Sequence, residues 1–173
     1  MSKSQWFLAH SKQDNPEEID VWCQELAEAM SGDGWDATVI SGRADYEHRS
    51  AALGGWKAWC RDIPFGVDYT GAPLYHGVIV PLDSLDENPT VGKATAQILQ
   101  GFIDQSKHVF AWCPDSKSFR QVTLVEQLPE DNWVSWARVE FGSRHCGTDS
   151  ITSDNPKQPS WRTNATIRHK HLQ

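Results

Sequence analysis

The sequence lacks any hydrophobic run long enough to cross a bilayer, and its cysteines are far apart. A spanning helix needs about 20 apolar residues in succession. The apolar run nearest the N-terminus covers only residues 6–9, which is also too short for a signal peptide. We therefore expect a cytoplasmic protein. Cys23, Cys60, Cys113 and Cys146 form no C-x-x-C pair, so the pattern predicts free thiols and no zinc site.

The common catalytic motifs are missing as well. There is no Walker A sequence, no G-x-G-x-x-G, no G-x-S-x-G and no H-E-x-x-H. Gly92 and Lys93 lack the remaining Walker residues and indicate a helix start instead. His169 and His171 have no third ligand nearby, so we expect neither a metal nor a cofactor.

The charge of the chain is unevenly spread. Residues 1–141 hold 11 Lys/Arg and 21 Asp/Glu, a formal charge of −10, whereas residues 142–173 hold 5 and 2, a charge of +3. The acidic part argues against non-specific nucleic-acid binding. The basic part is either a solvated tail, or a segment that contacts nucleic acid or an acidic surface of its own or a neighbouring subunit. We expect a domain over 1–141, an irregular tail over 142–173, and possible homo-oligomer formation through that tail.

Apolar runs alternate with amphipathic segments along the domain. Residues 5–10, 36–41, 76–82 and 108–113 are expected to form buried strands. The alternation β-α-β-α-β-α-β predicts an α/β fold, a flavodoxin-like three-layer sandwich with a mainly parallel sheet. Two further strands, 119–126 and 133–141, are expected, either of which may run antiparallel at an edge.

The first helix has the clearest signals. Asn15 can cap it, Pro16 suits the first turn, and Glu18 follows three residues after the cap. One apolar stripe follows, made of Ile19, Trp22, Cys23, Leu26, Ala29 and Met30.

The next two helices are less sharply bounded. Polar residues 42–49 are expected to form a loop, followed by a helix with Leu53, Trp56, Cys60 and Ile63 on one side that ends at Pro64. Residues 65–73 are expected to be a loop. A third helix is expected, because Val91, Ala94, Thr95, Ile98 and Phe102 fall at helical spacing.

Polar residues follow three of the predicted strands. In open α/β sheets, ligands bind beyond the carboxyl ends of the strands where the winding reverses. The loops expected there bring together His10, Ser11, Lys12 and Asp14; Ser41, Arg43, Asp45, Glu47, His48 and Arg49; and Asp83, Ser84, Asp86, Glu87 and Asn88. Solubility alone would also favour polar residues in such loops.

Three segments carry a family resemblance. WFLAHSK (residues 6–12), HGVIVPLD (76–83) and VGKATAQILQGFIDQSKHV (91–109) resemble nucleoside 2-deoxyribosyltransferases, and residues 7–14 are equally similar to TIR domains. The resemblance implies a nucleoside or nucleotide ligand and cleavage or transfer at an N-glycosidic bond. It assigns Asp83 to holding the base.

The chain departs from this family at the nucleophile. The family uses a glutamate on the third helix, where this sequence has Gln97 and no carboxylate between Lys93 and Asp104. A glutamine cannot form the glycosyl ester or balance an oxocarbenium ion with a full negative charge. Two hypotheses follow: an active glycosyltransferase or N-glycosidase that uses another acid, or a non-catalytic binding or assembly protein.

Candidate residues are assigned under the first hypothesis. The catalytic candidates are Asp83, Asp86, Glu87 and Gln97, with Asp45 and Glu47 as further possible acids. The substrate-binding candidates are His10, Ser11, Arg43, Asp45, Glu47 and Gly92.

Overall fold

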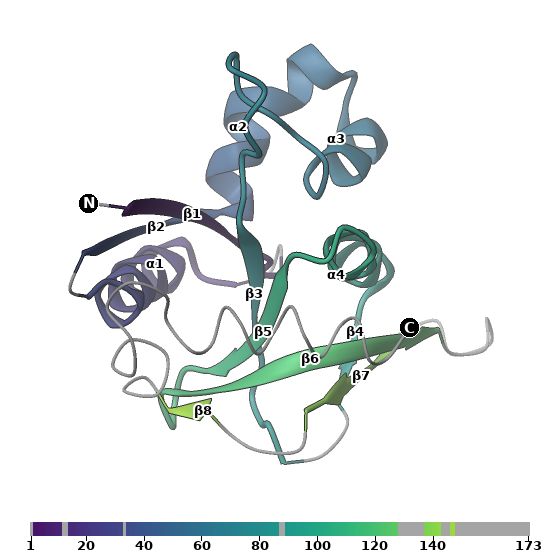
Figure 1. The fold of residues 1–173 in the computed structure, drawn as a ribbon. Coiled ribbons are helices and arrows are strands. Elements are labelled where there is room, and N and C mark those ends of the chain that lie inside the picture. The colour runs from purple at the N-terminus through teal and green to yellow at the C-terminus, as the bar shows by residue number, and fades with distance from the viewer. Residues whose placement is uncertain are drawn as a thin grey trace.

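The computed structural model describes residues 2–11, 14–32, 34–86, 89–127, 137–142 and 146–147 (Figure 1). In chain order its elements are β1 (Ser2–Leu8), α1 (Pro16–Met30), β2 (Trp35–Ser41), α2 (Gly42–Leu53), α3 (Trp56–Asp62), β3 (Gly77–Pro81), β4 (Thr90–Val91), α4 (Lys93–Asp104), β5 (His108–Cys113), β6 (Ser118–Gln127), β7 (Ala137–Phe141) and β8 (Cys146–Gly147).

The strands form one mixed sheet in the order β2-β1-β3-β5-β6-β7-β4, with β8 paired to β6. The first four strands of this order are parallel, and the remaining pairs are antiparallel. The chain moves from β1 outward to β2 and then returns past β1 to β3, so the winding reverses between β1 and β3. The predicted flavodoxin-like α/β fold is confirmed.

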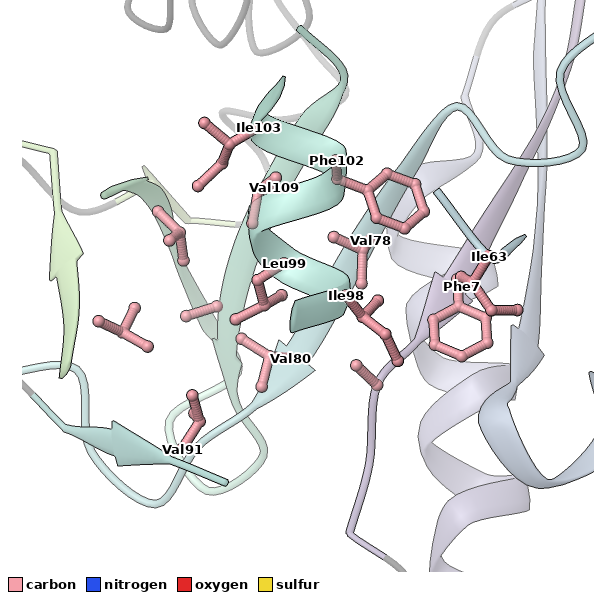
Figure 2. Packing of buried hydrophobic residues seen from close by; sticks show 14 of the residues in the cluster. Phe7, Ile63, Val78, Val80, Val91, Ile98, Leu99, Phe102, Ile103 and Val109 are labelled. Atoms are coloured by element: carbon pink, nitrogen blue, oxygen red, sulfur yellow. The ribbon is translucent and has the colours of Figure 1, made fainter. Parts of the chain in front are cut away.

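Successive residues of β1 point to opposite faces of the sheet, as a pleated strand requires. Trp6 and Leu8 pack with the α1 residues Ile19 and Leu26 on one face. Phe7 lies on the other face, in the cluster that includes α3 and α4. Figure 2 shows α4 laid on this face, with Leu99 close to Val80 and Phe102 on the side of Phe7 and Ile63; all of these residues belong to one buried cluster.

The expectation of a loop over residues 42–49 is wrong, because α2 begins at Gly42. Its start is fixed by Ser41, whose Oγ accepts a hydrogen bond from the Ala44 N–H (3.1 Å). Two side-chain pairs at i, i+4 spacing, Arg43–Glu47 and Asp45–Arg49, add support within the helix. The polar stretch is therefore helical, with Arg43, Glu47 and His48 exposed and Asp45 buried.

The single helix expected up to Pro64 is in fact two. Gly54 and Gly55 separate α2 from α3, and both have left-handed φ angles, 98° and 107°. Side chains rarely adopt this conformation, so glycine at both positions sets the turn. The third predicted helix also starts later than expected, because Val91 belongs to β4 and pairs with Ala137 of β7.

The two C-terminal strands, β6 and β7, both run antiparallel to their neighbours, an orientation that the sequence left open for either of them. β6 matches the predicted strand 119–126. Of the predicted strand 133–141, the structure describes Ala137–Phe141 as β7. Within the predicted tail, Cys146–Gly147 pairs with β6, and most of 142–173 lies outside the described residues. Among the described helices, none combines the length and the apolar character needed to cross a membrane.

Candidate functional site

A cavity of about 780 Å³ opens at the carboxyl ends of β1 and β2, beside the reversal of the winding. We call it the β1 cavity. Its volume falls within the usual range for small-molecule sites, about 300–1,000 Å³. Its described lining comes from β1 and the loop after it, and from α1, α2, α3 and α4: Phe7, Ala9, His10, Asp14, Asn15, Pro16, Ile19, Gly42, Arg43, Tyr46, Trp56, Trp59, Ala94, Thr95 and Ile98.

Three aromatic side chains form one wall of the β1 cavity. Tyr46 packs edge-on against Trp59, with ring centroids 5.2 Å apart, and against Trp56 at 5.6 Å. The two indole rings are 5.3 Å apart and tilted by 33°. Trp59 is buried, whereas Tyr46 and Trp56 are half-buried. The wall therefore presents partly exposed aromatic surface to the cavity while its base is fixed in the core.

A buried hydrogen-bond network supports this wall from behind. Asp45 is only 6% exposed, and its Oδ2 accepts a hydrogen bond from Trp59 Nε1 at 2.8 Å. Its Oδ1 accepts from the Tyr75 hydroxyl at 2.6 Å. Arg49 binds the same carboxylate through Nε and Nη2, and donates through Nη1 to Asp62 at 2.7 Å. Asp45, predicted to contact substrate, instead has both oxygens engaged by protein and is not part of the cavity lining.

The pKa shifts of Tyr75 and Arg49 keep these two hydrogen-bond donors of the network protonated. Burial strongly raises the pKa of Tyr75, and the hydrogen bond to Asp45 raises it further. Burial alone would lower the pKa of Arg49, but its hydrogen bonds to Asp45 and Asp62 outweigh that effect and raise it. At neutral pH the phenol and the guanidinium both keep their protons and both can donate to Asp45.

His10 lies where it was predicted, at the end of β1 in the cavity lining. The backbone N–H of Arg43 donates to His10 Nε2 at 3.1 Å, so this nitrogen is the acceptor. His10 Nδ1 then carries the proton and donates to the Ser11 carbonyl at 2.9 Å. Both ring nitrogens are thus used within the protein, and His10 contributes a wall of the cavity rather than a proton acceptor.

Asp14 has the sole carboxylate among the described lining residues. Its Oδ2 accepts a hydrogen bond from the Ser11 N–H at 2.9 Å. Besides His10 and the aromatic wall, the other polar side chains in the described lining are Asn15, Arg43 and Thr95. Three helices, α1, α2 and α4, begin at the cavity, so the partial positive charges of their N-termini lie at its lining.

Of the remaining substrate-binding candidates, Arg43 belongs to the cavity lining, and Ser11, Glu47 and Gly92 do not. Arg43 lines it, and its guanidinium pairs with Glu47 at 3.3 Å. Glu47 and Ser11 are exposed and do not belong to the lining. Gly92 is the N-cap of α4 and is exposed.

The predicted catalytic residues are not brought into the cavity. Asp83 and Asp86 are exposed and outside its lining, and Glu87 lies outside the described residues. Gln97 is also exposed and faces grooves on another side of α4. A residue in a helix is rotated by about 100° from its neighbour, so Ile98 lines the cavity while Gln97 does not.

The aromatic wall was not anticipated from the sequence. The sequence pattern predicts Trp56 on the apolar side of a helix and Tyr46 in a loop. The available signal was the spacing of Trp56 and Trp59, three residues apart, which puts two large aromatic rings on one side of a helix.

No grouping of metal-ligating side chains occurs in the part of the chain that the structure describes. Cys23, Cys60 and Cys113 are free thiols, as predicted. Burial, together with nearby Asp20, raises the pKa of Cys23 to about 11, so this thiol is inert at neutral pH.

Comparison of the chain with protein-family models, with curated proteins and with solved structures finds no match. The resemblance to nucleoside 2-deoxyribosyltransferases and TIR domains stays a prediction.

Proposed function

We propose that this protein binds a nucleoside or nucleotide in the β1 cavity, with the base stacked on the aromatic wall. The observation that carries the proposal is the half-buried Trp56, backed by Trp59 and Tyr46, in a cavity at the winding reversal. Stacking of a base on an aromatic side chain contributes about 1–3 kcal/mol. We therefore expect the base of the ligand to stack on the ring of Trp56.

The polar side chains of the cavity suit a sugar. A carboxylate accepts hydrogen bonds from hydroxyl groups, and a threonine hydroxyl both donates and accepts. Asp14 and Thr95 enter the cavity from the loop before α1 and from α4. Together with the aromatic wall they provide complementary contacts for a ligand with one flat ring and one hydroxylated ring.

The proposed role is binding without cleavage of the glycosidic bond. The α4 positions in the cavity lining are Ala94, Thr95 and Ile98, none of which can act as a nucleophilic carboxylate. Asp45 is committed to its buried network. Among the described lining residues, cleavage would have to use Asp14, and this defines the competing enzymatic hypothesis.

The test is calorimetric titration of the full chain with a panel of ribonucleosides and 2′-deoxynucleosides. We expect at least one to bind and Trp56→Ala to weaken its affinity about tenfold or more. Trp22→Ala is the matched control, because Trp22 is also half-buried but packs on Trp112 at the other face of the sheet. Failure of every nucleoside, and of the corresponding 5′-monophosphates titrated in the same way, to bind would overturn the proposal.

Chromatography of the same mixtures separates binding from catalysis. We expect the nucleosides to be recovered intact. Release of free base that is abolished by Asp14→Asn would replace the binding role with N-glycosidic cleavage.

A further inference from the structure

A second hollow adjoins the β1 cavity between α3 and α4. It has a volume of about 460 Å³ and shares Trp56 and Ala94 with the β1 cavity. We call it the α3–α4 groove. Its described lining is Trp56, Lys57, Cys60, Arg61, Lys93, Ala94 and Gln97. The two hollows therefore meet at Trp56 and Ala94, which belong to the lining of both.

The lining of the groove is cationic. It contains Lys57, Arg61 and Lys93, and no carboxylate among its described residues. This stands out in a chain with a formal net charge of −7. A hollow lined by charges of one sign raises the local concentration of ions of the opposite sign, so this lining indicates a site for an anion.

The backbone sets these cations in place from two elements. Lys57 and Arg61 are four residues apart on α3 and share one side of the helix. Arg61 Nε donates to the Lys57 carbonyl at 3.3 Å, which holds the guanidinium along the helix. The ion pairs found within the described part of the chain do not include Lys57 or Arg61. The nearest acid in sequence, Asp62, is bound by Arg49.

The start of α4 adds to the positive field. Lys93 is its first residue, and the cap residue Gly92 has no side chain to accept a hydrogen bond from the first turn. The partial positive charge of a helix N-terminus favours phosphate groups. The basic side chains of α3 and the first turn of α4 thus act on the same hollow.

We propose that the α3–α4 groove binds the phosphate of a nucleotide whose base lies in the β1 cavity. This inference rests on the proposed function and narrows the ligand class from nucleosides to nucleoside phosphates. Trp56 borders both hollows, so a single ligand passing over it can stack its base on one side and reach Lys57 and Arg61 on the other.

The experiment compares nucleosides with their 5′-monophosphates and 5′-diphosphates by calorimetry on the full chain. The variant is Lys57→Gln together with Arg61→Gln, which removes two exposed charges without creating a cavity. The matched control is Lys3→Gln together with Arg138→Gln, which removes one lysine and one arginine from exposed positions on β1 and β7. Inorganic phosphate alone is titrated in parallel.

We expect phosphorylation to strengthen binding by about tenfold, since each exposed charge pair contributes modestly. The Lys57/Arg61 variant should lose this gain and keep its affinity for the unphosphorylated nucleoside within about twofold. The control should retain the gain. Raising the salt concentration should weaken nucleotide binding and leave nucleoside binding unchanged.

The outcomes separate this inference from the proposed function. Equal affinity for nucleoside and nucleotide, or a phosphate gain that survives in the Lys57/Arg61 variant, overturns the groove assignment and leaves nucleoside binding intact. Absence of binding by both nucleosides and nucleotides overturns both proposals. Inorganic phosphate that binds as tightly as the nucleotide shows that the groove takes free phosphate, and overturns the nucleotide assignment.

Discussion

The two faces of the sheet use tryptophan for different purposes. On the α1 face, Trp6 and Trp112 are fully enclosed among side chains such as Leu26 and Phe119. On the opposite face, Trp56 is half-buried and forms part of the cavity wall. Trp6 and Trp112 hold the layers together, whereas Trp56 leaves aromatic surface within reach of a ligand. The number of tryptophans in a sequence therefore does not by itself predict either a core or a binding surface, because the role of each ring depends on how far other side chains cover it.

The largest expected effect is a difference in stability between two variants, each of which removes one indole ring from one face of the sheet. Trp112→Ala should lower the free energy of unfolding by about 3–5 kcal/mol, because it leaves a cavity in a closed core. Trp56→Ala should cost much less stability, since its ring is half exposed. Urea unfolding followed by circular dichroism measures both losses. Equal losses would contradict the distinction between a core face and a cavity face.

Cutting the support behind the aromatic wall should have the next largest effect. Asp45→Asn removes a buried charge that Arg49, Trp59 and Tyr75 all contact, and should destabilise the fold by about 2–4 kcal/mol. We also expect weaker nucleoside binding, because Trp59 loses a fixed partner. Asp20→Asn on the exposed side of α1 is the control and should change neither property. Unaltered stability in Asp45→Asn would show that the network is not what holds the wall.

Alkaline pH should weaken the cavity face through Tyr75. Its pKa is raised in the fold, so its stabilising contribution is complete below the ordinary value of 10.0 and is lost as the pH rises beyond it. Above pH 10 the unfolded chain releases this proton and the folded chain retains it. The free energy of unfolding should then fall by about 1.4 kcal/mol per pH unit from this group.

Two phenylalanine variants isolate that effect. Between pH 10 and 11, Tyr75→Phe should lose about 1 kcal/mol less stability than the unmodified chain, because the unfolded tyrosine is only half deprotonated at pH 10. Tyr69→Phe should not, because Tyr69 is fully exposed. Parallel declines in all three proteins would assign the pH effect to other groups.

The smallest effect is expected at the rim of the β1 cavity. Glu47 makes an exposed ion pair with Arg43, and such pairs contribute about 0–1 kcal/mol. Glu47→Gln should leave stability within about 0.5 kcal/mol and nucleoside affinity nearly unchanged. A large loss of binding would restore Glu47 as a substrate contact and extend the site beyond the aromatic wall.

The sequence predicted the sheet better than the helices on its cavity face. Residues 76–82 and 108–113 are apolar runs without interruption, a pattern typical of strands buried on both faces. Residues 42–49 are polar enough to suggest a loop, and only the Ser41 cap and the i, i+4 charge pairs favour a helix there. Polarity outweighed these local signals in the prediction, since a helix that covers little of the core needs few apolar residues.

The candidate site was predicted in its position and only partly in its residues. His10 and Arg43 could be anticipated because strand order alone places the ends of β1 and β2 together. The rotation of α4 and the pairing of Asp45 depend on side-chain contacts between distant segments, such as Asp45 with Tyr75, thirty residues apart. No local pattern encodes such contacts. The same limit explains why Gln97 was assigned to the site and Trp59 was not.

The turn between α2 and α3 makes the wall of the β1 cavity depend on chirality. At Gly54 and Gly55 a methyl group would meet no atom within 4 Å, so space is not what excludes other residues. The positive φ angles alone exclude them. A D-alanine introduced by chemical synthesis should therefore be accepted where its mirror image is strained. The contact between Tyr46 and Trp56 therefore depends on a turn that restricts the chirality of its residues and not the size of their side chains.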